Sequence, residues 1–272
     1  MNPYPISDHP LIVFLSDFGL HDPYVGIVKG VIHSICPEAK VIDLTHEIPP
    51  HDIEAAAYIL SRTWRDFPDG TIFLSVVDPG VGGPRAALAA RAQDALFIAP
   101  DNGLISFLRE EFLEIRQITD ERFIRSGKMS ATFHGRDIFA PAAAHLAKGT
   151  DLKELGPETE GITMLERAPV NCSRDGIHGS IVWFDRFGNG ATDIPASLAS
   201  TCFGEDFPSR VRAVVRGMML PIVRTFSDVP KGSPLAIVNS FGDIEICING
   251  DSAKKRLELA KDEPVRLILS AS

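Results

Sequence analysis

The sequence lacks closely spaced cysteines. Only four of its 272 residues are cysteine, and they lie far apart with no Cys-x-x-Cys pair: Cys36, Cys172, Cys202 and Cys247. This spacing indicates neither a zinc knuckle nor a dense disulfide framework. We therefore expect four reduced thiols in a cytoplasmic protein.

Positive charge and long apolar runs are also scarce. There are 27 Lys and Arg residues against 36 Asp and Glu, so the formal net charge is −9. This sign disfavours nucleic-acid binding, which works by displacing phosphate counterions, and favours a small-molecule partner. No apolar stretch approaches the roughly 18 residues of a membrane-spanning helix, and residues 1–10 lack the cationic region of a signal peptide. We expect neither membrane association nor secretion.

Apolar residues are plentiful, at 44% against 23% charged residues, which is the mixture of a globular protein. In the first half, short apolar runs that predict buried strands alternate with windows of helical periodicity. The predicted strands are 11–16, 41–44 and 71–77, and the predicted helices are 24–35, 52–67 and 138–145. This alternation predicts an α/β domain with a largely parallel central sheet.

The pattern changes between residues 149 and 175, where Gly and Pro interrupt a polar stretch. Beyond it, helical periodicity mostly disappears and short β-rich runs follow one another between Gly, Pro and Asp turns. These runs are 179–184, 211–215, 235–238, 244–248 and 265–269. We predict an N-terminal α/β domain over residues 1–165 and a smaller all-β, barrel-like domain over residues 166–272.

Carboxylates follow the first predicted strand, and ligands of open α/β sheets bind beyond the carboxyl ends of strands. Asp17 comes directly after the strand, and its two oxygens could accept hydrogen bonds from a ribose diol. A helix or turn cap is an equally good interpretation of Asp17. Asp22 precedes Pro23 and is a stronger candidate for the cap of the helix that begins at Tyr24.

Two further segments carry groups that could take part in chemistry. Residues 78–85 hold three glycines and two prolines between Asp78 and Arg85, but they match neither a P-loop nor a dinucleotide fingerprint. A Gly/Pro connection with a structural ion pair is the alternative. Residues 132–137 place Phe133 and His134 next to charged partners, so His134 is either a general base or an ordinary hydrogen-bonding histidine.

The second half contains two comparable loops. Asp185, Phe187 and Asn189 close a predicted strand; Asn189 could pair with an adenine edge and Asp185 with an ammonium group, although a β-turn explains them equally well. Residues 239–245, which include Asn239, Ser240 and Glu245, form a turn by default and a ligand loop if they face the other domain.

Together, the order and spacing of these segments resemble the S-adenosylmethionine (SAM) hydroxide adenosyltransferase family, the SAM-hydrolysing relatives of fluorinases and chlorinases. The resemblance covers nearly the whole chain. The matching segments are Ser16-Asp-Phe-Gly19, Asp22-Pro-Tyr-Val-Gly26, Asp43-Leu-Thr-His-Glu-Ile-Pro-Pro50, Val76-Val-Asp-Pro-Gly-Val-Gly82 with Arg85, Ala99-Pro-Asp-Asn-Gly-Leu104, Phe133-His-Gly-Arg-Asp-Ile-Phe-Ala-Pro-Ala-Ala143, Asp185-Arg-Phe-Gly-Asn189 and Asn239-Ser-Phe-Gly242.

The resemblance implies an N-terminal α/β domain, a C-terminal β-barrel and a homotrimer with its sites at subunit interfaces. It also implies that water attacks the ribose C5′ of SAM to give adenosine and L-methionine, with SAM as substrate and with no metal and no organic cofactor. The water-using members carry an Asp, Arg and His set that falls here on Asp78, Arg85 and His134. Halogen-transferring members have an aromatic residue at the position of Asp78, which favours hydrolysis for this chain.

The same resemblance implies roles for the binding residues: Asp17 for the ribose hydroxyls, Asn189 for adenine, Phe187 for purine stacking, Asp185 for the methionine ammonium and Ser240 for its carboxylate. The chain departs from the halogenases at three positions, which are His51 at the ribose cap, Ala191 in place of an indole and Phe241 in place of an arginine. Asp22, Phe133, Asn239 and Glu245 complete the expected substrate-binding set.

Because sulfonium departs as a neutral thioether, the protein has only to supply a positioned, partly desolvated water. Pairing with Arg85 would make Asp78 a weak base, so we expect Asp78 to orient the water and His134 to remove its proton, while Arg85 stabilises developing hydroxide.

Two rival functions remain at this point. A metal-dependent phosphohydrolase would use carboxylate and imidazole ligands such as His46, His51, Asp52, His134 and Asp137, although their spacing matches no standard metal site. A SAM or adenosine sensor would keep the binding residues and would need no catalytic set.

Overall fold

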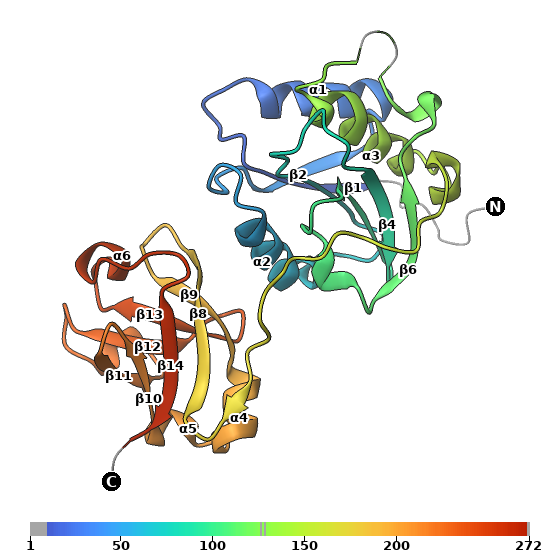
Figure 1. The fold of residues 1–272 in the computed structure, drawn as a ribbon. Helices are drawn as coiled ribbons and strands as arrows, with labels where there is room; N and C mark the ends of the chain where they lie inside the picture. Colours follow the sequence, from blue (N-terminus) through green and yellow to red (C-terminus); the bar gives the residue numbers. More distant parts are fainter. Residues whose placement is uncertain (1–9, 126, 128, 271–272) are drawn as a thin grey trace. The chain divides into compact units, whose positions relative to one another are not determined.

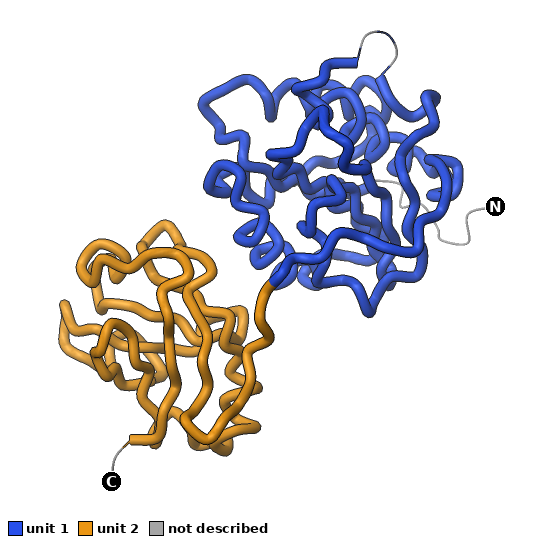
Figure 2. Tube along the Cα trace, in the orientation of Figure 1, with its two compact units in different colours: residues 1–166 blue, residues 167–272 orange. Residues whose placement is uncertain are grey.

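A computed structural model describes residues 10–125, 127 and 129–270. The segment used to predict the absence of a signal peptide lies almost entirely outside these residues. The chain divides into two compact units, residues 1–166 and 167–272, which Figure 2 shows in blue and orange. The prediction from sequence places the boundary after residue 165.

Unit 1 is built on a six-stranded sheet with the order β2-β1-β3-β5-β4-β6 (Figure 1). The strands β2, β1, β3 and β5 are parallel, whereas β4 is antiparallel to β5 and β6. Their bounds are β1 Leu11–Ser16, β2 Lys40–Thr45, β3 Ile72–Val76, β4 Ala87–Ala92, β5 Ala95–Pro100 and β6 Phe112–Gln117. The largely parallel sheet predicted from the sequence is thus confirmed.

Helices cover both faces of this sheet, with α1 and α3 on one side and α2 on the other (Figure 1). The helices are α1 Tyr24–Ile35, α2 Ile53–Thr63 and α3 Ala140–Ala147, and a π-helical turn, η4 Gly135–Phe139, leads into α3. Short 3-10 turns are η1 Trp64–Asp66, η2 Ser106–Leu108, η3 Glu121–Phe123 and η5 Leu152–Leu155. Alternate side chains of each strand point to opposite faces, so Phe14 packs under α1 and α3 while Phe73 stacks on Phe97 on the other face.

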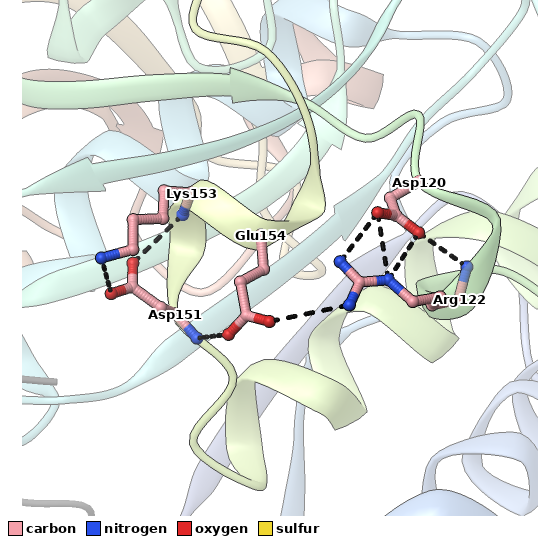
Figure 3. Close-up of polar contacts among 5 residues, drawn as sticks. All are labelled: Asp120, Arg122, Asp151, Lys153 and Glu154. Carbon is pink, nitrogen blue, oxygen red and sulfur yellow. Dashed lines mark hydrogen bonds and ion pairs between the residues drawn. The ribbon is translucent and has the colours of Figure 1, made fainter. Parts of the chain in front are cut away.

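A surface network joins η3 and η5. Arg122 pairs with Asp120 through two hydrogen bonds to Oδ2 and one to Oδ1, and Glu154 lies 4.0 Å from the same guanidinium (Figure 3). Asp151 caps η5 by accepting from the Lys153 backbone N–H, while Glu154 accepts from the Asp151 backbone N–H. These pairs are solvent-accessible, so each contributes little to stability.

Unit 2 is a closed barrel of seven strands in the order β14-β10-β11-β12-β13-β9-β8, and the pairing of β14 with β8 closes it. Only the pairing of β11 with β12 is parallel among those described for this unit. The strands are β7 Cys172–Ser173, β8 Gly176–Phe184, β9 Gly190–Pro195, β10 Val211–Val215, β11 Met218–Val223, β12 Pro234–Val238, β13 Asp243–Ile248 and β14 Pro264–Leu269, and the helical segments are α4 Ala196–Phe203, α5 Phe207–Arg210, η6 Phe226–Asp228 and α6 Ala253–Arg256. The predicted barrel-like domain is confirmed.

The prediction of four reduced cysteines is wrong for two of them. Cys172 in β7 and Cys202 in α4 form a disulfide, with their Cα atoms 6.0 Å apart. This pair could not be predicted from the spacing of the cysteines, because 30 residues separate the two and the fold of unit 2 brings them together. Cys36 and Cys247 are free and buried.

No helix among the described residues is long and apolar enough to cross a membrane.

Candidate active site

The parallel strands of unit 1 bring their carboxyl ends to one edge of the sheet. Asp17 follows β1 and Asp78 lies two residues beyond β3. Arg85 precedes β4, and because β4 is antiparallel its beginning lies at this same edge. His134 immediately precedes η4. The sheet order therefore places Asp17, Asp78 and Arg85 at one edge of unit 1, and the contact of Arg85 with His134 brings the fourth side chain to the same edge.

A cavity of about 260 Å³ opens at this edge. Four predicted site residues line it: Asp17, Asp78, Phe133 and His134. The remaining lining residues are Phe18, Tyr24, Pro50, His51, Val76, Val81, Thr132 and Gly135. The structure thus gathers residues that are up to 117 positions apart in the chain, counting from Asp17 to His134.

Arg85 connects Asp78 to His134. Its Nε donates to Asp78 Oδ1 at 2.9 Å and its Nη2 donates to Oδ2, so the guanidinium grips both carboxylate oxygens. The same Nη2 lies 2.7 Å from Nδ1 of His134. The side chains of Asp78 and Arg85 are 6% and 11% exposed, so this pair is largely shielded from water.

The contact with Arg85 sets the tautomer of His134. A guanidinium can only donate, so Nδ1 must accept and the neutral ring carries its hydrogen on Nε2. Burial lowers the pKa of His134 below its ordinary value of 6.5, and the neighbouring Arg85 charge lowers it further. His134 is therefore neutral at pH 7.

Glycine is required where the Asp78 loop meets the segment before His134. Gly82 has φ of +76°, and a Cβ at this position would collide with the carbonyl oxygen of Ala131. Asn102 supports the same loop, because its side-chain Nδ2 donates to the carbonyl of Val77, directly before Asp78, at 2.8 Å. Asn102 thus anchors the start of the loop, and Gly82 allows its close approach to Ala131.

Asp17 is only 10% exposed and accepts a hydrogen bond from the backbone N–H of His51 at 2.9 Å. His51 has φ of +69°, which is a left-handed conformation that non-glycine residues seldom adopt. Phe18 and Tyr24 are not among the site residues predicted from the sequence. Both rings pack edge-on with Phe133, with centroids 6.0 and 5.3 Å away, and form an aromatic wall of the cavity.

The structure does not place Asp22 in the cavity. It also does not cap α1: Pro23 occupies the N-cap position and no side chain makes a capping hydrogen bond. The prediction that Asp22 caps α1 is therefore wrong. The Asp22 side chain is instead 61% exposed, and its carboxylate lies 3.8 Å from His21.

The two carboxylates of the rival metal site, Asp137 and Asp52, are engaged in other contacts. Asp137 is fully buried and receives hydrogen bonds from Arg136 at 2.6 and 2.8 Å and from the Ser130 backbone N–H at 2.8 Å. Asp52 caps α2 by accepting from the Ala55 backbone N–H. Across the described residues, no three His, Cys, Asp or Glu side chains are grouped so as to hold a metal ion.

Unit 2 has a cavity of its own, of about 490 Å³. Two predicted residues, Phe187 and Asn189, line it together with Phe226, Ile248, Gly250, Asp251 and Ser252. Phe187 is 76% exposed, which leaves its ring face free for stacking. Phe226 was missed by the sequence argument, since nothing in its local pattern connects it to a site 39 residues away.

The other predicted residues of unit 2 lie in two hydrogen-bonded turns. Asp185 accepts from both the backbone N–H and the side-chain Nδ2 of Asn189, at 2.8 and 2.9 Å. Asn239 Oδ1 accepts from the backbone N–H groups of Phe241 and Asp243, as expected of a turn, and its Nδ2 donates to Glu245.

Glu245 and Ser240 differ sharply in their exposure to solvent. Burial raises the pKa of Glu245, and the Cys247 thiol donates to its Oε2 at 3.4 Å. Ser240, at the tip of its turn, is exposed.

These observations define a class: a two-unit protein in which an α/β unit carries an Asp–Arg–His cluster at the edge of its sheet and a β-barrel carries an aromatic and amide cavity. Models of the SAM hydroxide adenosyltransferase N-terminal and C-terminal domains match residues 12–156 and 179–266. The chain belongs to the SAM hydroxide adenosyltransferase family.

Individual relatives agree with this assignment. The chain is 40% identical to a Thermus thermophilus protein named (R)-S-adenosyl-L-methionine hydrolase, over 94% of this chain and 99% of that protein. It is 29% identical to a protein from Actinoplanes sp. named fluorinase, over 90% of this chain and 93% of that protein. A crystal structure of an uncharacterised conserved protein from Thermotoga maritima superposes with a TM-score of 0.89 at 37% identity, covering 94% and 99% of the two chains.

Proposed function

We propose that this chain hydrolyses SAM to adenosine and L-methionine by attack of water on the ribose C5′. The observation that carries the proposal is that Arg85 donates hydrogen bonds to the Asp78 carboxylate and also contacts His134. Asp78 and His134 line a cavity that Asp17 also lines. Relatives at 36% and 40% identity that are named (R)-S-adenosyl-L-methionine hydrolase support it.

In this mechanism Asp78 orients the attacking water. Each carboxylate oxygen keeps a free lone pair beside the one that Arg85 occupies, so Asp78 can still accept a hydrogen bond from the water. The bond between C5′ and sulfur breaks as the new C5′–O bond forms, and the sulfonium departs as a neutral thioether. No acid is needed at the leaving group, and the proton to be removed belongs to a strongly acidic oxonium.

The hydrogen bond from Arg85 changes the role expected of His134. Its Nδ1 is occupied and its Nε2 carries the ring hydrogen, so the ring cannot accept a proton while this contact lasts. We therefore assign proton acceptance to Asp78, which needs only weak basicity for an oxonium proton. The neutral ring of His134 also avoids adding a second positive charge beside the cationic substrate.

The substrate-binding roles are also part of the proposal. Asp17 holds the ribose hydroxyls, and Tyr24 and Phe133 flank the sugar. In unit 2, Phe187 and Phe226 line a cavity that suits a purine, with Asn189 at its edge.

For the methionine end, Asp185 pairs with the ammonium group and Ser240 with the carboxylate. Asn239 and Glu245 support the Ser240 turn, whereas Asp22, which does not line the cavity, is given no role in substrate binding. A homotrimer with its sites at subunit interfaces, a cytoplasmic location and independence of metals and organic cofactors complete the proposal. Light scattering of the purified protein tests the trimer.

The decisive experiment incubates chelator-treated protein with SAM in halide-free buffer and quantifies adenosine and L-methionine by chromatography. We expect equimolar products that depend on the protein and that disappear in Asp78→Asn. A matched control is Asp120→Asn, which removes another Arg-paired carboxylate, at the surface network of Figure 3.

Three results would contradict the proposal. Tight SAM binding without turnover would indicate a sensor. Activity that returns only on adding a divalent metal would indicate the metal-dependent alternative. A halogenated nucleoside formed on adding fluoride or chloride would indicate halogen transfer.

A further inference from the structure

Four polar side chains form a continuous chain beneath the loop that carries Asp17. Lys29 Nζ donates to Asp43 Oδ2 at 2.6 Å, and Asp43 Oδ1 lies 3.0 Å from Nε2 of His46. Nδ1 of His46 lies 2.7 Å from the hydroxyl oxygen of Ser16. We refer to these four residues as the Lys29–Ser16 chain; they come from α1, from β2, from the residue after β2 and from the end of β1.

The inner half of the Lys29–Ser16 chain is buried and contacts the backbone on both sides of Asp17. Ser16 is fully buried and His46 is 2% exposed. The Ser16 oxygen accepts from the backbone N–H of Phe18 at 3.3 Å, and the carbonyl of His46 accepts from the backbone N–H of Gly19 at 2.7 Å. The residues on both sides of Asp17 are therefore tied to this chain.

The donors and acceptors along the chain are consistent in direction. Because the Asp43 carboxylate can only accept, the His46 tautomer that suits both neighbours carries its hydrogen on Nε2 and accepts on Nδ1 from the Ser16 hydroxyl. Asp43 approaches this N–H off the line of an ideal hydrogen bond, so the link is an electrostatic contact between the carboxylate and the ring N–H. The Ser16 oxygen is then free to accept from Phe18.

A serine, histidine and aspartate in this order also suggest a nucleophilic triad. Ser16, however, is fully buried and does not line the cavity at Asp17, so its oxygen cannot reach a substrate. The Lys29–Ser16 chain therefore contacts the neighbouring backbone and not a bound molecule.

We propose that the Lys29–Ser16 chain is a positioning device for the Asp17 carboxylate. It holds the backbone of residues 16–19 so that Asp17, which His51 contacts from the other side, presents its carboxylate to a sugar diol in the cavity. Ser16 and His46 are thus positioning residues. This inference rests on the proposed function, because the ligand of Asp17 comes from it.

The test compares the binding of adenosine and 2′-deoxyadenosine to the full-length protein by calorimetry. A hydrogen bond to a charged group contributes about 1.5–3 kcal/mol, so the wild-type protein should prefer adenosine by about tenfold or more. We expect Asp17→Asn to remove most of this preference. Ser16→Ala and His46→Asn should lower it at least threefold, because they misalign the carboxylate without touching either ligand.

Two control variants match these changes. His145→Asn alters another histidine of unit 1 whose ring packs edge-on against a phenylalanine, as the ring of His46 does. Ser75→Ala removes another buried hydroxyl, which lacks a hydrogen-bond partner within the described part of the chain and lies on the strand beside β1. Both controls should keep the wild-type preference for adenosine.

The outcomes separate this inference from the proposed function. If Ser16→Ala and His46→Asn weaken the binding of adenosine and 2′-deoxyadenosine equally while Asp17→Asn abolishes the preference, the Lys29–Ser16 chain is merely structural. The inference is then wrong, but the proposed function stands. If the wild-type protein does not prefer adenosine, or if Asp17→Asn keeps the preference, Asp17 does not hold a sugar diol and the inference is wrong, whereas the proposed function fails only if SAM gives no adenosine and L-methionine. Should His46→Asn not fold, Ser16→Ala decides the question alone, because it removes a single oxygen atom.

Discussion

Replacing Arg85 by methionine should leave the Asp78 carboxylate shielded from water without its cation. The two side chains are 11% and 6% exposed, and the guanidinium contacts both carboxylate oxygens. Breaking a buried ion pair by removing one partner costs about 3–5 kcal/mol, since the remaining charge loses its compensation. The double variant Asp78→Asn/Arg85→Met removes both charges, so we expect it to cost clearly less than the two single changes added together.

The loss of stability expected for Arg85→Met is large enough to measure in the unfolding of unit 1. For a unit of 166 residues, 3–5 kcal/mol corresponds to a lowering of the unfolding midpoint by about 6–20 °C. The chain contains two tryptophans, of which Trp64 is buried in unit 1 against Phe97. In a Trp183→Phe background, tryptophan fluorescence therefore reports the unfolding of unit 1 alone.

The coupling energy from the double-mutant cycle decides the matter. We expect about 2–3 kcal/mol between the two positions, as found for residues in direct contact. If the two single losses added to within about 0.5 kcal/mol, Asp78 and Arg85 would not interact energetically, and the reasoning from the buried pair would be refuted.

Three other predictions concern pH and redox state. Burial and Arg85 lower the pKa of His134 below 6.5. We therefore expect kcat/KM for SAM to be constant at neutral pH and to fall only at more acidic pH, where His134 becomes a second positive charge beside Arg85. A fall in kcat/KM centred above pH 6.5 would contradict this. Burial raises the pKa of Glu245 above 4.5, so the folded state binds more protons and its stability declines as pH rises through the folded-state pKa. Thermal midpoints should therefore show Glu245→Gln gaining stability relative to wild type between pH 4.5 and 7, and a relative loss over this interval would be inconsistent. The Cys172–Cys202 disulfide closes a 30-residue loop and should stabilise unit 2 by about 3–4 kcal/mol. Alkylation of the denatured, unreduced protein should modify two of its four cysteines. Four modified cysteines would disprove the pairing.

Local patterns were sufficient for much of unit 1. The helix predicted over residues 24–35 is α1, and the strand predicted over 11–16 is β1, with the same bounds. These elements follow from apolar periodicity and from the proline that ends the helix pattern, which depend only on near neighbours in the chain.

Other elements could not be predicted from local patterns. The segment 87–92 is rich in alanine, a helix former, yet it forms strand β4 because it lies hydrogen-bonded between β5 and β6. The Cys172–Cys202 disulfide was missed for a related reason: the proximity of β7 and α4 is a property of the barrel and leaves no trace in residue spacing.

The sequence by itself determined the fold class, the family and the residue types that follow each strand of unit 1. The tertiary structure decided how these residues interact. It joined Arg85 to His134 across 49 positions, which occupies Nδ1 and changes the role expected of the ring, and it joined Ser16 to His46 beneath Asp17. Such contacts depend on distances of about 3 Å between side chains, and these are set by the strand order β2-β1-β3-β5 and by the loops at its edge, not by separation along the chain.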